Sequence, residues 1–192
     1  MMNEPVFVTS LVVNVLETLG ILYLIGGSFA STAYGRVRTT QDVDIVAYIE
    51  PKHVDAFLKA LNNAFYADES MIRRAISSRT SFNLIHLETA FKVDIFLPKE
   101  RPFDRQQLTR RVKRVIDKDS AREVYFASPE DTILAKLEWY RLGGEESERQ
   151  WLDIQGILQL RLEQLDIQYL KDSAAAMQTA DLLERSFAEI QN

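Results

Sequence analysis

The sequence predicts an α+β protein, in which helices and strands alternate through residue 127 and helices alone continue from residue 128 to residue 192. The first observation behind this prediction is a set of short apolar runs in the first part, bounded by turn residues as strands commonly are. The second is a change at residue 128, after which apolar residues recur at helical spacing. We therefore expect a sheet-containing core over 1–127 and a C-terminal helical region over 128–192, packed on that core.

Three segments of the first part are expected to be helical, and a fourth is either helical or irregular. The first has apolar residues at helical spacing and ends at Gly20. Ser28 offers a hydroxyl suited to capping the second, and Pro51 suits the first turn of the third. The predicted helices cover residues 6–19, 28–35 and 51–65, and residues 71–78 are helical or irregular.

Strands are predicted where apolar runs are short or where apolar and polar residues alternate. They cover residues 21–25, 42–49, 81–88, 91–98, 110–116 and 122–127. The strands on either side of Thr89 and Ala90 form a predicted hairpin. The last two resemble edge strands around a polar turn at 117–120. In the C-terminal region, Ser128 is a suitable N-cap for a helix that ends at Gly143.

Composition excludes several classes of site. The 192 residues contain no cysteine and two histidines, which excludes disulfide scaffolds, thiolate zinc sites, cysteine nucleophiles and histidine-rich metal sites. No apolar run reaches the roughly 18 residues of a membrane span. Glu4 and Glu17 within the first apolar pattern favour an amphipathic helix over a signal peptide. We therefore expect a cytoplasmic protein with no membrane partner.

The net charge of −5 gives no general sign of a polyanionic partner. Basic residues nevertheless cluster in the segment RRVKRVIDK, residues 110–118, and at Arg73 and Arg74. Such clusters are either solvated faces or a surface for a nucleic acid or nucleotide, and the sequence leaves both interpretations open.

A glycine pair, Gly26 and Gly27, separates a predicted strand from a predicted helix. Backbone N–H groups and the helix dipole at such a turn favour a phosphate group, and the hydroxyl of Ser28 adds a further polar group. A simple tight turn is the alternative for the same residues.

Two carboxylates, Asp42 and Asp44, lie one residue apart within the next predicted strand. Side chains alternate along a strand, so both project from one face, roughly 6 to 7 Å apart. Asp94 lies in the same way between Val93 and Ile95 of a later strand. If these strands are neighbours, three carboxylates converge, and oxygen ligands favour Mg²⁺ or Mn²⁺. Such a site suits two-metal phosphoryl transfer, whereas an exposed edge strand is the alternative.

Together, the segments LIGGSFA, RTTQDVDIV and FKVDIF resemble the motifs of the nucleotidyltransferase superfamily that shares the DNA polymerase β-like fold. That family has an apolar strand, then Gly-Gly or Gly-Ser, then Asp-x-Asp, and a third acid on a later strand. The form R-x-T-x-D-x-D, which begins at Arg38, is similar to a minimal prokaryotic branch that includes the AbiEii-type toxins. The resemblance implies a nucleotidyltransferase-fold mixed sheet flanked by helices, and an enzyme that uses an NTP with Mg²⁺ or Mn²⁺.

On this hypothesis the site residues fall into two groups. The metal-binding and catalytic residues are Asp42, Asp44 and Asp94, of which Asp94 could also act as general base toward the acceptor hydroxyl. The nucleotide-binding residues are Gly26, Gly27, Ser28, Arg38, Thr40 and Lys136. The glycine turn would hold the β- and γ-phosphates, while Arg38 and Thr40 either contact phosphate or hold the loop in place.

Lys136 matches a lysine that the family carries in a helix after the sheet, where it would contact the phosphates. A surface lysine is the alternative. The family's next helix carries a Lys-Asp-x-x-Asp-like element, for which this chain offers Arg149 and Asp153 and has Gln150 in place of an acid.

Three functions are compatible with the sequence. The first is an enzyme that transfers a nucleoside monophosphate from an NTP to a hydroxyl of RNA, a protein or a small molecule. The second is a catalytically silent module that binds a nucleotide or a partner, against which the presence of all three acids argues. The third is a toxin held by a cognate antitoxin protein. The sequence leaves the acceptor and the preferred NTP open.

Overall fold

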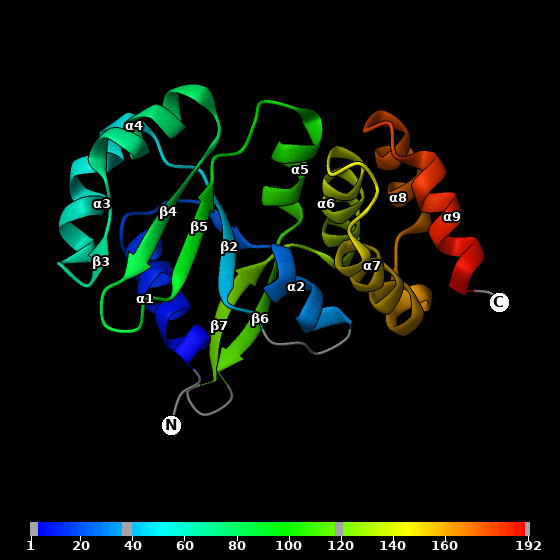
Figure 1. The fold of residues 1–192 in the computed structure, drawn as a ribbon, viewed down its shortest axis with the longest axis horizontal. Helices are drawn as coiled ribbons and strands as arrows, with labels where there is room; N and C mark the ends of the chain where they lie inside the picture. The colour runs from blue at the N-terminus through cyan, green and yellow to red at the C-terminus, as the bar shows by residue number, and fades with distance from the viewer. Residues whose placement is uncertain (1–3, 36–39, 118–120, 191–192) are drawn as a thin grey trace. The chain divides into compact units, whose positions relative to one another are not determined.

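The computed structural model describes residues 4–35, 40–117 and 121–190, which group into two compact units. The sheet unit comprises Met1–Gly26 and Thr40–Phe126, and the helical unit comprises Gly27–Thr39 and Ala127–Asn192. Figure 1 shows the strands of the sheet unit and helices α6 to α9 of the helical unit. The predicted division into domains after residue 127 stays a prediction, because this grouping does not show which part folds alone.

The sheet unit is built on a mixed sheet that, within the described residues, has seven strands in the order β3-β4-β5-β2-β1-β7-β6. The strands are β1 (Tyr23–Ile25), β2 (Asp42–Ala47), β3 (Phe65–Tyr66), β4 (Ser81–His86), β5 (Lys92–Phe96), β6 (Val112–Asp117) and β7 (Arg122–Phe126). β2 is parallel to β5 and β1 is parallel to β7, whereas the other neighbouring strands are antiparallel. The predicted α+β fold with a mixed sheet is confirmed, and so is the hairpin of β4 and β5.

The prediction for the last two strands is partly wrong. β6 lies at an edge of the sheet, but β7 pairs with β6 on one side and with β1 on the other. Val124 and Phe126 of β7 are buried, as expected of an interior strand. Pairing with β1 joins segments far apart in the chain, so local sequence carried no sign of it.

Within the described residues, the helical segments of the sheet unit are α1 (Glu4–Thr18), the 3-10 turn η1 (Pro51–His53), α3 (Val54–Leu61), α4 (Glu69–Ser78) and α5 (Pro102–Arg110). α1 contacts β2 and α3, and α4 contacts β4; α1 lies behind the strands in the view of Figure 1. The apolar residues Val43, Ile45, Val93 and Ile95 of β2 and β5 are completely buried. Because side chains alternate, the polar residues between them project from the opposite face.

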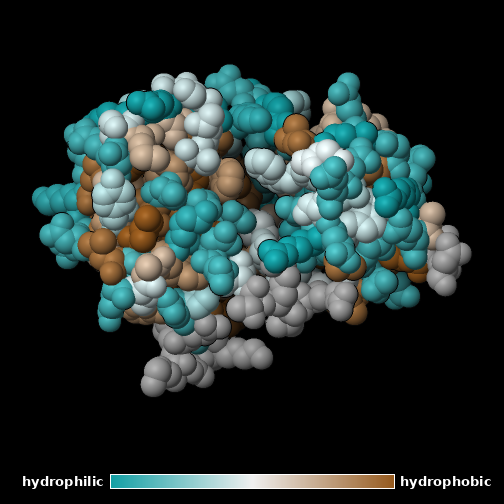
Figure 2. Space-filling model, in the orientation of Figure 1, coloured by the Kyte–Doolittle hydropathy of each residue, from teal (hydrophilic) through white to brown (hydrophobic). Residues whose placement is uncertain are grey.

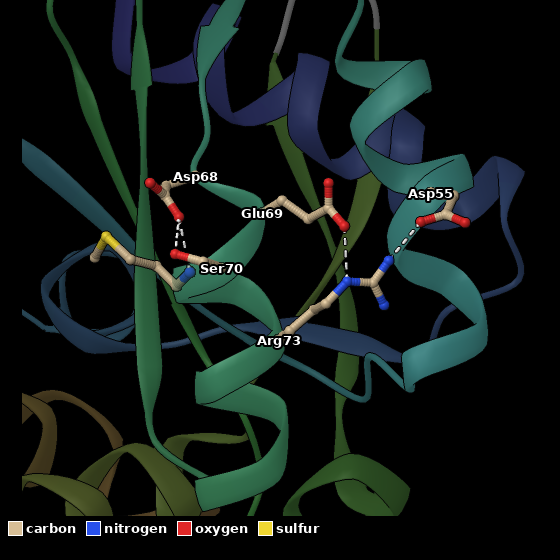
Figure 3. Close-up of polar contacts among 6 residues, drawn as sticks. Asp55, Asp68, Glu69, Ser70 and Arg73 are labelled. Carbon is tan, nitrogen blue, oxygen red and sulfur yellow. Dashed lines mark hydrogen bonds and ion pairs between the residues drawn. The ribbon is translucent and has the colours of Figure 1, made fainter.

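Polar contacts connect α3 with α4 (Figure 3). Asp68 caps α4, and its Oδ1 accepts a hydrogen bond from the hydroxyl of Ser70 at 2.6 Å. Arg73 of α4 places its Nε 2.8 Å from Oε1 of Glu69 and its Nη2 2.6 Å from Oδ1 of Asp55 on α3. Water screens these exposed ion pairs, so each contributes little to stability.

Helix α5 was not predicted. Pro102 takes its first position, and the guanidinium Nε of Arg101 lies 2.6 Å from Oδ2 of Asp104. This start signal was present in the sequence, but the helix has few apolar residues, so its periodicity is weak.

The helical unit contains α2 (Gly27–Tyr34), α6 (Pro129–Leu142), α7 (Glu148–Arg161), the 3-10 turn η2 (Leu162–Gln164), α8 (Ile167–Ala176) and α9 (Ala180–Ile190). α2 comes early in the chain but contacts α6 and α7. At its end, a Cβ on Gly35 would lie 3.1 Å from backbone atoms of Gly156 and Ile157, so glycine permits this close approach. Within the described ranges, none of the helices has the length and apolar character needed to cross a membrane.

The two predicted serine caps have different outcomes. Ser128 caps α6, and its Oγ accepts a hydrogen bond from the N–H of Asp131 at 3.0 Å. Ser28 is not a cap, because α2 begins one residue earlier and places Ser28 in its first turn. Gly27, the first residue of α2, has a φ of +54°, which glycine adopts at little cost.

Candidate functional site

The three predicted carboxylates lie on one face of the sheet, on two adjacent parallel strands. Asp44 of β2 is the register partner of Asp94 of β5, and Asp42 is the register partner of Lys92. Partners on adjacent strands are about 4.8 Å apart and project from the same face. The condition for convergence of the three carboxylates, that their strands are neighbours, is therefore met, whereas the catalytic and metal-binding roles stay predictions. We call Asp42, Asp44, Lys92 and Asp94 the acidic face.

The row that contains Asp44 and Asp94 continues on both sides. On β4, Asn83 is the register partner of Asp94. Toward β1, the N–H of Gly26 donates a hydrogen bond to the backbone oxygen of Asp44 at 2.8 Å. The pairing of β1 with β2 thus brings the first glycine of the turn beside the acidic face.

That hydrogen bond changes the predicted role of Gly26. The N–H of Gly26 already donates to the backbone oxygen of Asp44. Gly26 would therefore help phosphate binding because it has no side chain, and not by donating a hydrogen bond. A Cβ built at this position meets only Cδ1 of Leu24, at 3.9 Å, which is an ordinary contact. Neighbouring backbone therefore does not require glycine at residue 26.

Lys92 forms an ion pair within the acidic face. Its Nζ lies 2.7 Å from Oδ2 of Asp94. The hydrogen bond to Asp94 raises the pKa of Lys92 above its ordinary value, and the negative charges of Asp42 and Asp44 add to this effect. An ammonium group thus offsets part of the negative charge of the three carboxylates.

Thr40 holds the carboxylate of Asp42. Its hydroxyl lies 3.0 Å from Oδ1 and also 3.0 Å from the backbone oxygen of Asp42. A hydroxyl that donates to a carboxylate orients it, as groups around metal ligands commonly do. Whether Thr40 also contacts phosphate stays a prediction.

Apolar residues adjoin the acidic face. Ile85 of β4 is the register partner of Lys92, and Phe96 of β5 is the register partner of Val46. Figure 2 shows apolar residues among hydrophilic ones on the surface of the sheet unit over β4 and β5. Apolar neighbours lower the local polarity, which strengthens electrostatic interactions with a bound ion or phosphate.

The donor atoms of the acidic face suit Mg²⁺ or Mn²⁺. Within the described ranges, no three histidine, cysteine, aspartate or glutamate side chains are arranged as they stand to hold a metal ion. Mg²⁺ commonly takes only one or two carboxylates and completes its octahedron with water and substrate phosphates. Asp42 and Asp44 provide such a pair, and the ammonium of Lys92 shows that this face accommodates a cation.

In the helical unit, Lys136 belongs to a buried polar cluster. Its Nζ lies 2.8 Å from Oδ2 of Asp153 and 2.9 Å from Oε1 of Gln150. The hydroxyl of Ser31 donates to the same Oδ2 at 3.0 Å. The side chains of Lys136 and Asp153 are 4% and 6% exposed. The surface-lysine alternative is therefore wrong, and the phosphate contact of Lys136 stays a prediction.

Gln150 and Asp153 of α7 are both partners of Lys136 in this cluster. Gln150, which stands where an acid is usual, accepts a hydrogen bond from Lys136, and Asp153 supplies the negative charge.

The remaining nucleotide-binding candidates are Gly27, Ser28 and Arg38. Gly27 and Ser28 lie in the first turn of α2. Arg38 lies outside the described residues. The backbone oxygen of Ser28 accepts a hydrogen bond from the hydroxyl of Ser31 at 3.1 Å.

Sequence reasoning missed Lys92 as part of the site. The signal was available, because a residue two positions before Asp94 in a strand projects from the same face.

No protein-family model matches the sequence, and no curated protein matches it. Among solved structures, ANT(2'')-Ia in complex with adenylyl-2''-tobramycin is similar, with a TM-score of 0.62 and 12% identity over 92% of this chain and 98% of that chain. An antigenic nucleotidyltransferase-like protein from Paracoccidioides brasiliensis is similar, with a TM-score of 0.59 and 19% identity over 95% and 91%. At these identities the likeness concerns the fold alone. The chain has a fold of the nucleotidyltransferase type.

Proposed function

We propose that this chain is a nucleotidyltransferase that moves a nucleoside monophosphate from an NTP to a hydroxyl group, with pyrophosphate as the leaving group. The observation that carries the proposal is the register of β2 and β5, which sets Asp44 beside Asp94 with Asp42 on the same face. The likeness in fold to ANT(2'')-Ia, an antibiotic-resistance factor whose structure holds adenylyl-2''-tobramycin, supports this class of reaction.

In this proposal Asp42 and Asp44 hold Mg²⁺ or Mn²⁺, and Thr40 orients Asp42. When bound, the metal would offset the charge of the triphosphate and activate the attacking oxygen. Asp94 would accept the proton of the acceptor hydroxyl. The oxygen of that hydroxyl would form a bond to the α-phosphorus of the NTP as the bond from the α-phosphorus to pyrophosphate breaks. The lack of a side chain at Gly26 would let a phosphate approach the backbone beside Asp44.

The proposal is tested by calorimetric titration of each NTP, with and without Mg²⁺, into the wild type and the variant Asp42→Asn/Asp44→Asn. We expect binding that depends on Mg²⁺ and disappears in the double variant. Asp55→Asn is the control, because Asp55 is an exposed carboxylate of the same unit that pairs with Arg73. Absence of binding to the wild type would contradict the proposal.

A second candidate is a catalytically silent module that binds a nucleotide or a partner. The ion pair between Lys92 and Asp94 favours it, because the residue assigned as base is already engaged. Release of pyrophosphate with RNA, protein or an aminoglycoside as acceptor separates the two functions. Mg²⁺-dependent NTP binding without pyrophosphate release from any acceptor would support the silent module.

We further propose that the chain belongs to the branch of the AbiEii-type toxins and works in the cytoplasm, where NTPs are abundant. The Arg-x-Thr-x-Asp-x-Asp form that ends at Asp44 supports this proposal. Expression should then arrest growth, Asp44→Asn should relieve the arrest, and a cognate antitoxin protein should do the same. Unaffected growth on expression of the wild type would count against a toxin.

A further inference from the structure

Lys92 stands out because it is a cation that the strand register places among three carboxylates. It is two residues before Asp94 on β5 and directly opposite Asp42 on β2. Its Nζ lies 2.7 Å from Oδ2 of Asp94, and its side chain is 42% exposed. Lys92 therefore has both a fixed partner and room to move on its flexible stem.

The ammonium and a divalent cation would compete for the same oxygens. Three carboxylates on one face repel one another, and the free energy of this repulsion falls when a positive charge lies among them. An ammonium does this when no metal is bound. A divalent ion on Asp42 and Asp44 would place two further positive charges beside Lys92, which would then be repelled.

We infer that Lys92 is a positioning residue that acts as a built-in counter-ion: it holds Asp94 when the divalent metal is absent and opposes binding of the metal. This inference rests on the proposed function, since it concerns the same metal. Lys92 thereby stabilises the metal-free protein and lowers the affinity of the acidic face for the metal alone. A merely structural ion pair would have the first effect without the second.

The test measures binding of Mn²⁺ without nucleotide, from the electron paramagnetic resonance signal of free Mn²⁺, together with the melting temperature without metal. Lys92→Met should bind Mn²⁺ roughly tenfold more tightly, as expected for removing one charge beside a divalent ion in a largely hydrated site. Its metal-free melting temperature should fall by roughly 2 to 4 °C. Lys92→Arg keeps the charge and should restore the weak binding of the wild type.

Lys52→Met is the matched control. Lys52 belongs to the same unit, and its Nζ also lies 2.7 Å from a carboxylate oxygen, Oε2 of Glu50. Glu50 is a single carboxylate and does not belong to the acidic face. Lys52→Met should therefore leave the Mn²⁺ affinity unchanged. Lys92→Gln, a neutral variant that keeps a polar end, repeats the measurement if the methionine variant does not fold.

The outcomes separate the inference from the proposed function. Equal Mn²⁺ affinity in the wild type, Lys92→Met and Lys92→Gln would overturn the inference while the metal site stands. Absence of Mn²⁺ binding in the wild type and in both neutral variants would overturn the metal site and the inference together. Binding that is tighter in the neutral variants and is lost with Asp44→Asn would support both.

Discussion

At the scale of single residues, Gly26 and Gly27 of the turn differ in how well the backbone at each position would tolerate a side chain. Gly26 has room for a Cβ, whereas Gly27 has a φ of +54° that other residues adopt at a cost of about 1–2 kcal/mol. We therefore expect Gly26→Ala to keep the melting temperature and to weaken NTP binding about tenfold or more, because its methyl would obstruct a phosphate. Gly27→Ala should instead lower the melting temperature. Calorimetry and thermal unfolding of both variants check this, and full NTP affinity in Gly26→Ala would contradict the proposed approach of phosphate.

A second prediction at this scale concerns the buried pair of Lys136 and Asp153. Lys136→Met leaves a buried carboxylate without its ammonium, so we expect a loss of about 3–5 kcal/mol of unfolding free energy. The double variant Lys136→Met/Asp153→Leu should regain much of this loss, because it removes both charges of the pair. Urea unfolding of the wild type, Lys136→Met and the double variant measures the three unfolding free energies. Equal stability of Lys136→Met and the wild type would show that the pair contributes little.

At the scale of elements, the start of α6 offers a direct test of the capping rule. Ser128 is buried, and its Oγ accepts the hydrogen bond from the N–H of Asp131. Ser128→Ala should lower the unfolding free energy by about 1 kcal/mol, because that N–H loses its partner. Ser128→Asn should retain most of the stability, since its side-chain oxygen can accept the same bond. Chemical unfolding of both variants provides the comparison.

The elements also show where local sequence is informative. The N-cap at Ser128 and the hairpin around Thr89 were predicted because their signals lie within a few residues. The interior position of β7 was not predicted, because it results from pairing between Phe126 and Ile25. Local signals thus predict where elements begin and end better than which elements are neighbours.

At the scale of the whole molecule, the membership of α2 in the helical unit leads to a prediction about truncation. A fragment of residues 1–127 contains α2 without α6 and α7, against which it packs. The buried Ala30 and Tyr34 would then be exposed, so we expect a broad thermal transition and binding of a hydrophobic dye. A chain that replaces residues 27–39 of this fragment with a short Gly-Ser linker should unfold more sharply. β1 and β2 are antiparallel neighbours, so such a linker closes a hairpin. Equally sharp transitions in both fragments would contradict this expectation.

The sequence by itself determined the α+β class, most of the helices and strands, and the common face of Asp42 and Asp44. These features follow from the spacing of side chains along one helix or strand, which is a local property of the backbone. Only the tertiary structure decided that Asp94 lies beside Asp44, that Lys92 pairs with Asp94, and that α2 joins the C-terminal helices. The physical reason is that these contacts join distant parts of the chain and depend on which strands and helices pack together, which no local pattern of residues specifies.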